Sequence, residues 1–339
     1  MNIMKVSVGI DVSMKDFHAC VKVKTDDNTV KIKGIKRFEQ TEKGYREFLL
    51  WSQAKASKQE QDVEIYYTME ATGTYYENLA YFLYSENCKV SVVLANKIKN
   101  YAKSLNVKIK TDKVDSKIIA DYGIERSTGT WKPMAPSYKK LRDISREILS
   151  LKKDINRAKS QLHALNYSHN KLDLLKQQKE DQIEFYENMI AELKKELENI
   201  TKQEPELAGK IKKLETIPGI RFYTAIAVIC ETNGFELFKN IRQVVSYAGL
   251  DIAIKESGTI KGKARITKKG NSRIRQVLYM PAMAAVQSNE PIKRLHSRIC
   301  EKNPNVKNKG IIAAMRKLLI LTFVLWKKNE EFDHNYQWS

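Results

Sequence analysis

The sequence has few of the residues that hold stapled or metal-bound folds together. Its 339 residues include only four cysteines, which lie far apart and form no CxxC pair. This spacing signals neither a disulfide framework nor a zinc site, and it fits a reducing cytoplasm. The five histidines are equally scattered and lack the i, i+4 spacing of a zinc-binding helix, so we interpret them as surface or core residues.

Long apolar runs are also missing. The longest one, residues 311–326, contains Arg316 and Lys317 and is shorter than a membrane-spanning helix. We therefore expect a buried core helix there and no membrane partner. The N-terminus enters a strand-like run without the charged, apolar and small-residue order of a signal peptide, which favours a cytoplasmic protein.

Acidic residues are outnumbered by basic ones. The chain carries 60 Lys and Arg against 40 Asp and Glu, which gives a net charge of +20. Such an excess favours a polyanionic partner, and nucleic acid is the leading candidate.

The first third of the chain contains both strand and helix patterns. Residues 5–24 predict two strands joined by a turn near Ser13, and residues 30–38 predict a third strand. From Thr41, a plausible helix cap, to Gly123, helical patterns alternate with two further strand patterns. This order predicts an α/β sheet with helices on its faces and is consistent with a ribonuclease H-like topology.

The middle of the chain predicts a coiled coil. No glycine or proline lies between Pro136 and Pro205, and apolar residues recur there at alternating spacings of three and four. The pattern fits either one long helix or a helical hairpin broken near residues 166–170. An intramolecular hairpin would use the apolar seam within one chain, whereas we favour self-association through it.

Two features of the C-terminal part indicate nucleic-acid binding. A Pro218-Gly219 turn between two short helical patterns can direct backbone N–H groups at a phosphate. Residues 255–275 hold eight basic residues and one acidic residue, and a solvated basic face is the alternative interpretation. The candidate nucleic-acid-binding residues are Gly219, Lys255, Lys261, Lys263, Arg265, Lys268, Lys269, Arg273 and Arg275.

Four carboxylates form the candidate catalytic set. Asp11 and Glu70 end two predicted strands, and open α/β sheets bind ligands beyond the carboxyl ends of their strands. Asp112 and Asp115 lie on one face at the start of a predicted helix. If the four converge, they would hold Mg²⁺ or Mn²⁺ for phosphoryl transfer, because these cations prefer oxygen ligands. The alternative is that Asp112 is an N-cap and Asp115 stabilises the helix dipole.

Two sets of motifs resemble one known family. GID in the first strand, YYTMEATG around Glu70 and TDKVDSKIIA from Thr111 resemble the RuvC-like DEDD domain of bridge-RNA-guided insertion-sequence transposases, relatives of the pilin-gene invertases. LETIPGI with TAIAVICE resembles the helix-hairpin-helix of that family. YAGLD, ESGTIKG and ITKKGNSRIRQVLY resemble its C-terminal transposase domain.

This resemblance implies a domain order and a fold class. We expect an α/β, ribonuclease H-like (RuvC-like) domain over residues 1–136 and a coiled coil over residues 137–206. A mainly α-helical transposase domain with a helix-hairpin-helix is expected over residues 207–339.

The resemblance also implies roles for individual residues. The four carboxylates match the metal-binding acids of the family, with Mg²⁺ or Mn²⁺ as the cofactor. Ser257 in the ESG motif matches the proposed nucleophile, which attacks a DNA phosphate and leaves a phosphoserine link. From the residues alone, Ser257 reads as a turn serine before Gly258, and Ser272 is our second choice of nucleophile.

The partners implied by the resemblance are donor and target DNA, a structured guide RNA and further copies of the chain in a dimer or tetramer. The location implied is the prokaryotic cytoplasm, in association with the nucleoid. Two alternatives remain open: a metal-dependent, structure-selective endonuclease that uses water as its nucleophile, and an inactive DNA-binding relic.

Overall fold

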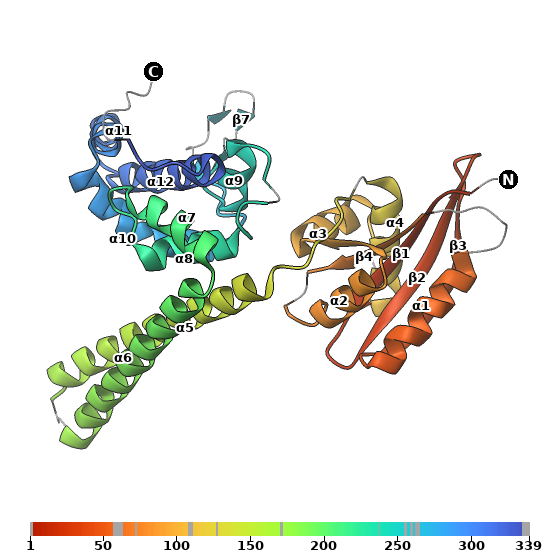
Figure 1. Cartoon of the computed structure of the whole chain (residues 1–339), viewed down its shortest axis with the longest axis horizontal. Coiled ribbons are helices and arrows are strands. Elements are labelled where there is room, and N and C mark those ends of the chain that lie inside the picture. The colour runs from red at the N-terminus through yellow and green to blue at the C-terminus, as the bar shows by residue number, and fades with distance from the viewer. Residues whose placement is uncertain are drawn as a thin grey trace. The chain divides into compact units, whose positions relative to one another are not determined.

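The chain forms two compact units, residues 1–133 and 134–339 (Figure 1). The computed structural model describes residues 3–56, 64–71, 73–107, 111–126, 128–169, 172–236, 238–253, 256–257, 260–261 and 265–333. Each unit has its own apolar core, and each is described by itself below.

The N-terminal unit is built on a five-stranded mixed sheet with the strand order β3-β2-β1-β4-β5. The central strand β1 pairs antiparallel with β2 and parallel with β4. Strands β2 and β3 are antiparallel, and β4 and β5 are parallel. The strands are β1 (Ile3–Val12), β2 (Asp16–Thr25), β3 (Val30–Glu39), β4 (Ile65–Glu70) and β5 (Lys89–Val93).

Helices cover both faces of this sheet. The described helices of the unit are α1 (Glu42–Ala56), α2 (Glu77–Ser85), α3 (Ala95–Ser104) and α4 (Asp112–Glu125). Side chains alternate along β2, so Phe17 packs against Phe48 of α1, whereas Lys22 on the opposite face reaches α4. The predicted strands and helices of this part are confirmed, and the Thr41 hydroxyl caps α1 by accepting a hydrogen bond from Gly44 N at 3.1 Å.

Trp131 marks the end of the N-terminal unit. Its ring makes edge contacts with Tyr81 and Tyr84, with ring centroids 5.3 and 6.2 Å apart. Its backbone N–H donates to Val90 O at 2.7 Å. These contacts fix the segment that leaves the sheet.

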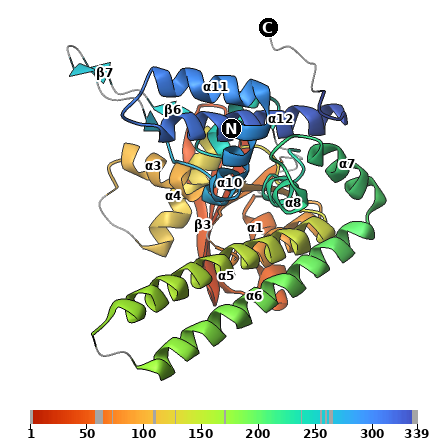
Figure 2. The ribbon, with the colours of Figure 1, turned by 90° about the vertical axis from the view of Figure 1, so that its left-hand side faces the viewer.

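The coiled coil is a helical hairpin. Helices α5 (Pro136–Tyr167) and α6 (Asp173–Lys202) lie side by side and are joined at one end (Figure 2). Their buried seam consists of Leu141, Ile148, Leu151, Ile155, Ile190, Leu197 and Ile200. These side chains already pack within one chain, so self-association of the hairpin remains a prediction that would have to use its other surfaces.

The remaining helices pack around the base of this hairpin in one continuous core. They are α7 (Pro205–Glu215), α8 (Phe222–Glu231), α9 (Ile241–Tyr247), α10 (Ser272–Ser288), α11 (Glu290–Glu301) and α12 (Asn308–Lys328). Helix α12 is the core helix expected from the longest apolar run, with Leu318 and Leu319 fully buried. In the part of the chain that the structure describes, no helix is both long and apolar enough to cross a membrane.

Candidate active site and nucleic-acid interface

Two glycines allow helix α4 to lie directly on strand β1. A Cβ atom at Gly9 would lie 2.1 Å from Ala120 N, and one at Gly123 would lie 2.3 Å from the Ser7 hydroxyl. Because Gly123 faces Ser7 while Ala120 faces Gly9, α4 runs antiparallel to β1. Its N-terminus therefore points toward the carboxyl end of that strand.

Two lysines fix the C-terminal half of α4 to the sheet. Lys22 Nζ lies 2.5 Å from Asp121 Oδ1, and both side chains are largely buried. Lys5 Nζ donates to the carbonyl oxygens of Ile124 at 3.1 Å and Arg126 at 3.3 Å, where a helix C-terminus favours a cation. Partial burial lowers the pKa of Lys5. The first turn of α4 is thereby held in a set position.

Asp11 and Glu70 occupy neighbouring positions at one edge of the sheet. Ile10 pairs with Met69 in the parallel β1–β4 register, so the next residues along the two strands are Asp11 and Glu70. Both side chains are half-buried. The carboxyl ends of parallel strands thus bring these two acids together, as the sequence predicts.

The first turn of α4 brings the other two acids to the same edge. Asp112 Oδ2 lies 3.8 Å from Nδ1 of His18, and His18 is the residue opposite Asp11 in the β1–β2 register. Asp115 precedes Ser116, whose carbonyl oxygen faces Gly9, two residues before Asp11. The four candidate acids therefore come from three elements that meet at one end of the sheet.

The interpretation of Asp112 as an N-cap is wrong. Thr111 is the N-cap of α4, and its hydroxyl accepts a hydrogen bond from Val114 N at 3.3 Å. Asp112 is the first helical residue and is exposed. Because a threonine satisfies the end of the helix, the Asp112 carboxylate is available to contact His18.

The donor chemistry of the four carboxylates fits a divalent ion. In the described ranges, no group of three or more His, Cys, Asp or Glu side chains is arranged to hold a metal ion. Mg²⁺ is commonly bound by one or two protein carboxylates, with water and substrate phosphates completing its shell. An ion held by these acids would therefore need water and a phosphate ligand to complete its shell.

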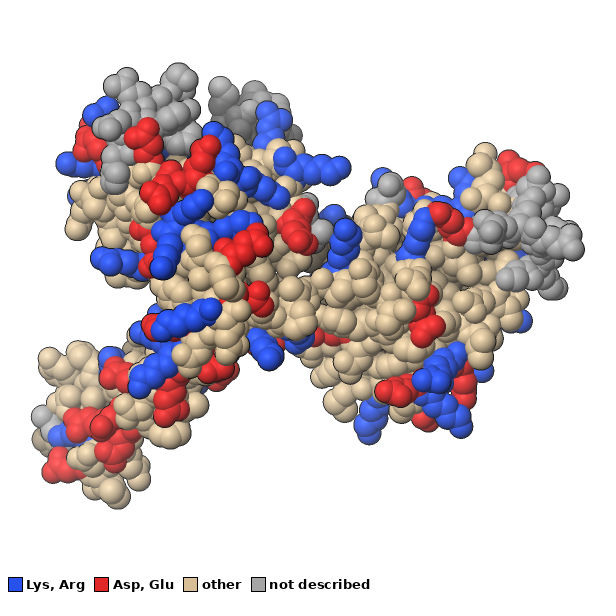
Figure 3. Space-filling model, viewed as in Figure 1, with Lys and Arg blue, Asp and Glu red and all other residues tan. Residues whose placement is uncertain are grey.

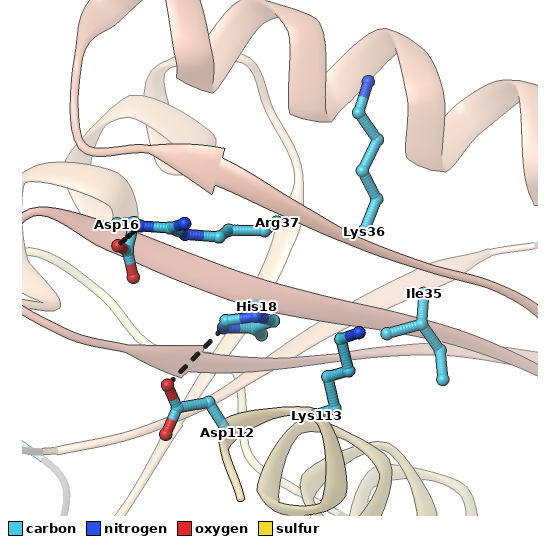
Figure 4. Close-up of a pocket in the computed structure, with 7 residues that line it drawn as sticks. All are labelled: Asp16, His18, Ile35, Lys36, Arg37, Asp112 and Lys113. Atoms are coloured by element: carbon cyan, nitrogen blue, oxygen red, sulfur yellow. Dashed lines mark hydrogen bonds and ion pairs between the residues drawn. The ribbon is translucent and has the colours of Figure 1, made fainter.

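A pocket of about 530 Å³ opens beside these acids (Figure 4). Asp112 and His18 line it together with Asp16, Arg37 and Lys113. The sequence interpretation missed His18, Asp16 and Arg37 as site residues. The β1–β2 hairpin contains a usable signal, because its turn over residues 13–16 pairs Asp11 with His18.

Ser257 lies in a small β structure between α9 and α10. Strands β6 (Ile252–Ala253) and β9 (Arg265–Ile266) pair antiparallel, and so do β7 (Glu256–Ser257) and β8 (Ile260–Lys261). Ser257 pairs with Ile260, so its backbone lies at the closed end of a β-hairpin. For Ser257 and Lys261 the structure describes the backbone only, and Lys255 and Lys263 lie outside the described residues.

We call residues 252–266 the serine hairpin. The YAGLD segment before it and the TKKGN segment after it anchor its base. The Thr267 hydroxyl donates to Asp251 Oδ1 at 2.5 Å, and Thr267 N donates to Asp251 O at 2.9 Å. A Cβ at Gly270 would lie 2.3 Å from Tyr247 O, so this position requires glycine for close backbone approach. The YAGLD and TKKGN segments therefore hold the two ends of the hairpin against each other.

Comparison with known proteins now gives the function class. A transposase family model of the IS110 DEDD type matches residues 8–166, and the transposase model of the IS116/IS110/IS902 family matches residues 211–297. The chain is a DNA transposase or recombinase, and both matched regions are similar to IS110-family transposases. The first match contains all four acids, and its DEDD domain implies a divalent metal requirement. The second match contains Ser257.

Two relatives that align along nearly the whole chain are named for their function. The pilin gene-inverting proteins of Moraxella bovis and Moraxella lacunata are each 29% identical to this transposase over 331 residues. The alignments cover 97% of this chain and 98% of each relative. The similarity therefore extends over both compact units.

A buried ion pair of this transposase joins helix α8 to the coiled coil and, through Asn271, to the N-terminus of α10. Glu231 of α8 accepts two hydrogen bonds from Arg146 of α5, at 2.6 and 3.0 Å, and one from Asn271 Nδ2 at 2.7 Å. Asn271 is also the N-cap of α10, accepting from Arg273 N and Ile274 N. Burial alone would raise the pKa of Glu231, but its bonds to Arg146 and Asn271 lower it overall.

The basic candidates have different environments. Arg265, Lys268, Lys269 and Arg273 are exposed. Arg275 is half-buried and donates to Ala248 O at 2.7 Å, so it stabilises the turn after α9. On the face seen in Figure 3, basic side chains are spread over the C-terminal unit with acidic ones between them.

Gly219 has a structural reason to be glycine. Its φ is +100°, and a Cβ there would lie 2.8 Å from both Ala285 Cβ and Pro281 O of α10. The Pro218-Gly219 turn thus packs on α10, and its role in phosphate binding stays a prediction.

Proposed function

We propose that this transposase cleaves and rejoins the DNA of a mobile element, with Ser257 as the nucleophile and Asp11, Glu70, Asp112 and Asp115 as its metal-binding acids. The observation that carries the proposal is the position of α4. Its close packing on Gly9 directs the helix start, with Asp112 and Asp115, to the edge where Asp11 and Glu70 end their strands.

The proposed chemical step is a transesterification. The Ser257 hydroxyl oxygen attacks a backbone phosphorus, and a new Oγ–P bond forms as the P–O bond to one deoxyribose breaks. The serine gives up its proton, and the departing deoxyribose oxygen is protonated. The resulting phosphoserine link conserves the energy of the phosphodiester for rejoining. A divalent ion at the acids would stabilise the charge that develops on the phosphate oxygens.

The finer assignments are also proposals. We infer a ribonuclease H-like domain, supported by the strand order β3-β2-β1-β4-β5, and Mg²⁺ or Mn²⁺ as its ion. The α7–α8 pair with its Pro-Gly turn supports a helix-hairpin-helix. We also infer a structured guide RNA. Base pairing by that RNA would supply the sequence specificity and leave the protein to bind nucleic-acid backbones, which agrees with a net charge of +20. Assembly into a dimer or tetramer would bring acids and serine together between copies.

Removal of the serine hydroxyl tests the mechanism. The wild-type protein, incubated with DNA carrying the ends of its own element, is expected to form a covalent protein-DNA adduct on a denaturing gel. Ser257→Ala should abolish the adduct while DNA binding is retained, and the matched control Ser272→Ala should keep it. An adduct formed by Ser257→Ala would remove this residue from the mechanism. Cleavage without an adduct in either protein would favour the endonuclease alternative.

Removal of one carboxylate charge tests the acidic site. Asp115→Asn is expected to lose recombination at any Mg²⁺ concentration, because the ion would lack a ligand. The control is Glu42→Gln, since Glu42 also lies in the first turn of a helix. If Asp115 only supports the helix dipole, both variants would stay active and lose about 0.3–1 kcal/mol of stability.

A further inference from the structure

The pocket beside the acidic edge lies on the sheet face that carries α4. Its walls come from β2, β3 and the first turn of α4 (Figure 4). Asp112 belongs both to this pocket and to the proposed metal-binding acids. A ligand in the pocket would therefore continue directly into the acidic edge.

Two cations face this pocket from opposite walls. Arg37 pairs with His18 in the β2–β3 register, so both side chains lie on the α4 side of the sheet. Arg37 is bound to Asp16, and this bond lowers the pKa of Asp16 and keeps it charged. The Arg37 side chain is still 66% exposed, so donors remain open to a ligand. Lys113 extends across the pocket from the first turn of α4 (Figure 4).

His18 forms the inner wall of the pocket. Its side chain is only 12% exposed, and Asp112 Oδ2 lies 3.8 Å from its Nδ1. The imidazole is thereby held between the β2 strand and the start of α4. Its position separates the basic side of the pocket from the acids at the strand ends.

We propose that this pocket binds a phosphodiester of the DNA strand that is being cleaved, one step along the strand from the phosphate at the acids. Arg37 and Lys113 contact its non-bridging oxygens, as guanidinium and ammonium groups do in other phosphate sites. A volume of about 530 Å³ is in the range of small-ligand sites and leaves room for more than a phosphate group. The inference rests on the proposed function, because it takes the neighbouring acids as the cleavage site.

The chain supplies a matched control for the charge itself. Lys36 precedes Arg37 on β3, and its ammonium lies 5.0 Å from the centroid of the Phe38 ring. In Figure 4 its side chain points away from the pocket toward the helix above the sheet. Lys36 also lines the pocket, but its ammonium points away from it. Lys36→Gln therefore removes the same charge from the same strand without removing a cation that faces the pocket.

The test measures binding in the absence of chemistry. Full-length variants are titrated with a fluorescein-labelled, 30-nucleotide single-stranded DNA in EDTA, and anisotropy gives the dissociation constant. Lys113→Gln and Arg37→Gln are each expected to weaken binding about 5- to 10-fold. Each should also reduce the slope of log K against log salt concentration by the equivalent of about one phosphate contact. Lys36→Gln should weaken it less than about 2-fold, because only long-range charge is lost.

Several outcomes would overturn the proposal. Equal effects of the three substitutions would mean that the pocket adds nothing to general electrostatic attraction. A loss seen only with RNA of the same sequence would assign the pocket to RNA instead. Lys113 is exposed in the first helical turn, so Lys113→Gln is informative even if Arg37→Gln, which frees Asp16, fails to fold.

The result is separable from the nucleophile test. Normal binding by Lys113→Gln together with loss of the adduct in Ser257→Ala would reject the pocket and keep the proposed function. Weak binding by Lys113→Gln together with an adduct in Ser257→Ala would keep a DNA-binding pocket and reject the serine mechanism.

Discussion

At the scale of single residues, the site depends on which side chain satisfies each polar group. Thr111 caps α4, so Asp112 is left exposed and near His18. Asn271 performs two tasks, because its side chain caps α10 while its amide nitrogen donates to Glu231. Substitution of a buried polar residue with several hydrogen-bond partners, such as Glu231, lowers stability because it leaves those partners unsatisfied.

Glu231→Gln is expected to destabilise the C-terminal unit by roughly 3 kcal/mol at pH 7. The substitution removes the charge that pairs with Arg146, and the estimate is at the low end for a buried pair because the Arg146 side chain is one-third exposed. Urea denaturation of the full chain, compared with the exposed control Glu236→Gln, measures the difference. A loss equal to that of the control would show that the ion pair adds no stability.

The same residue gives a pH dependence with a definite sign. The pKa of Glu231 is lowered from its ordinary 4.5 in the folded state, so its stabilisation is complete above pH 4.5. The contribution is lost as the pH falls through the folded pKa. We expect the stability gap between wild type and Glu231→Gln to narrow as the pH falls from 5 toward 3. A gap that widens on acidification would contradict this assignment.

At the scale of elements, α4 is the part that assembles the acidic edge. It contributes two acids and crosses β1 at a distance that only glycine permits. The two lysine contacts hold its far half, so the sheet sets the position of its first turn. Helix α4 thereby fixes the positions of Asp112 and Asp115 relative to the sheet.

Gly9→Ala is therefore expected to displace α4 and to reduce both stability and activity. The new methyl group would meet helix backbone at Ala120, and overpacking of this kind typically costs about 1–3 kcal/mol. Gly129→Ala is the control, because a Cβ there meets nothing within 4 Å. Thermal unfolding and the adduct assay are the measurements, and wild-type behaviour of Gly9→Ala would disprove the close packing.

At the scale of the whole molecule, the acidic motifs and the serine motif belong to two units with separate apolar cores. The acidic residues lie in the first compact unit, and the serine hairpin lies in the second together with the coiled coil. The C-terminal core includes residues of α5 and α6, so the helical hairpin packs as part of that unit.

A fragment of residues 134–339 is expected to fold by itself, because its core is complete without the sheet. Its circular dichroism should show a helical protein with a cooperative thermal transition. A fragment of residues 207–339 should be less stable, since it lacks Arg146 and the seam residues of α5. Equal stability of the two fragments would argue that the hairpin is an independent domain.

Local patterns predicted most of the elements correctly. The β1–β2 hairpin, the strand ending at Glu70 and the buried helix α12 follow from alternation, turn residues and apolar periodicity, which act over a few residues. The alternative interpretation of Asp112 as an N-cap was wrong, because the choice between two adjacent cap residues depends on backbone angles at Thr111. It missed Glu231 and Arg146, which are 85 residues apart and carry no local signal.

The sequence by itself determined the elements, the excess of positive charge and the motifs that resemble a transposase. Elements and motifs depend on short stretches of chain, and net charge depends on composition alone. Tertiary structure alone decided that the coiled coil folds back on itself, that α4 rests on Gly9, and that Arg37 and Lys113 face one pocket. The physical reason is that such contacts join residues remote in sequence, and their geometry is set by how closely two backbones can approach.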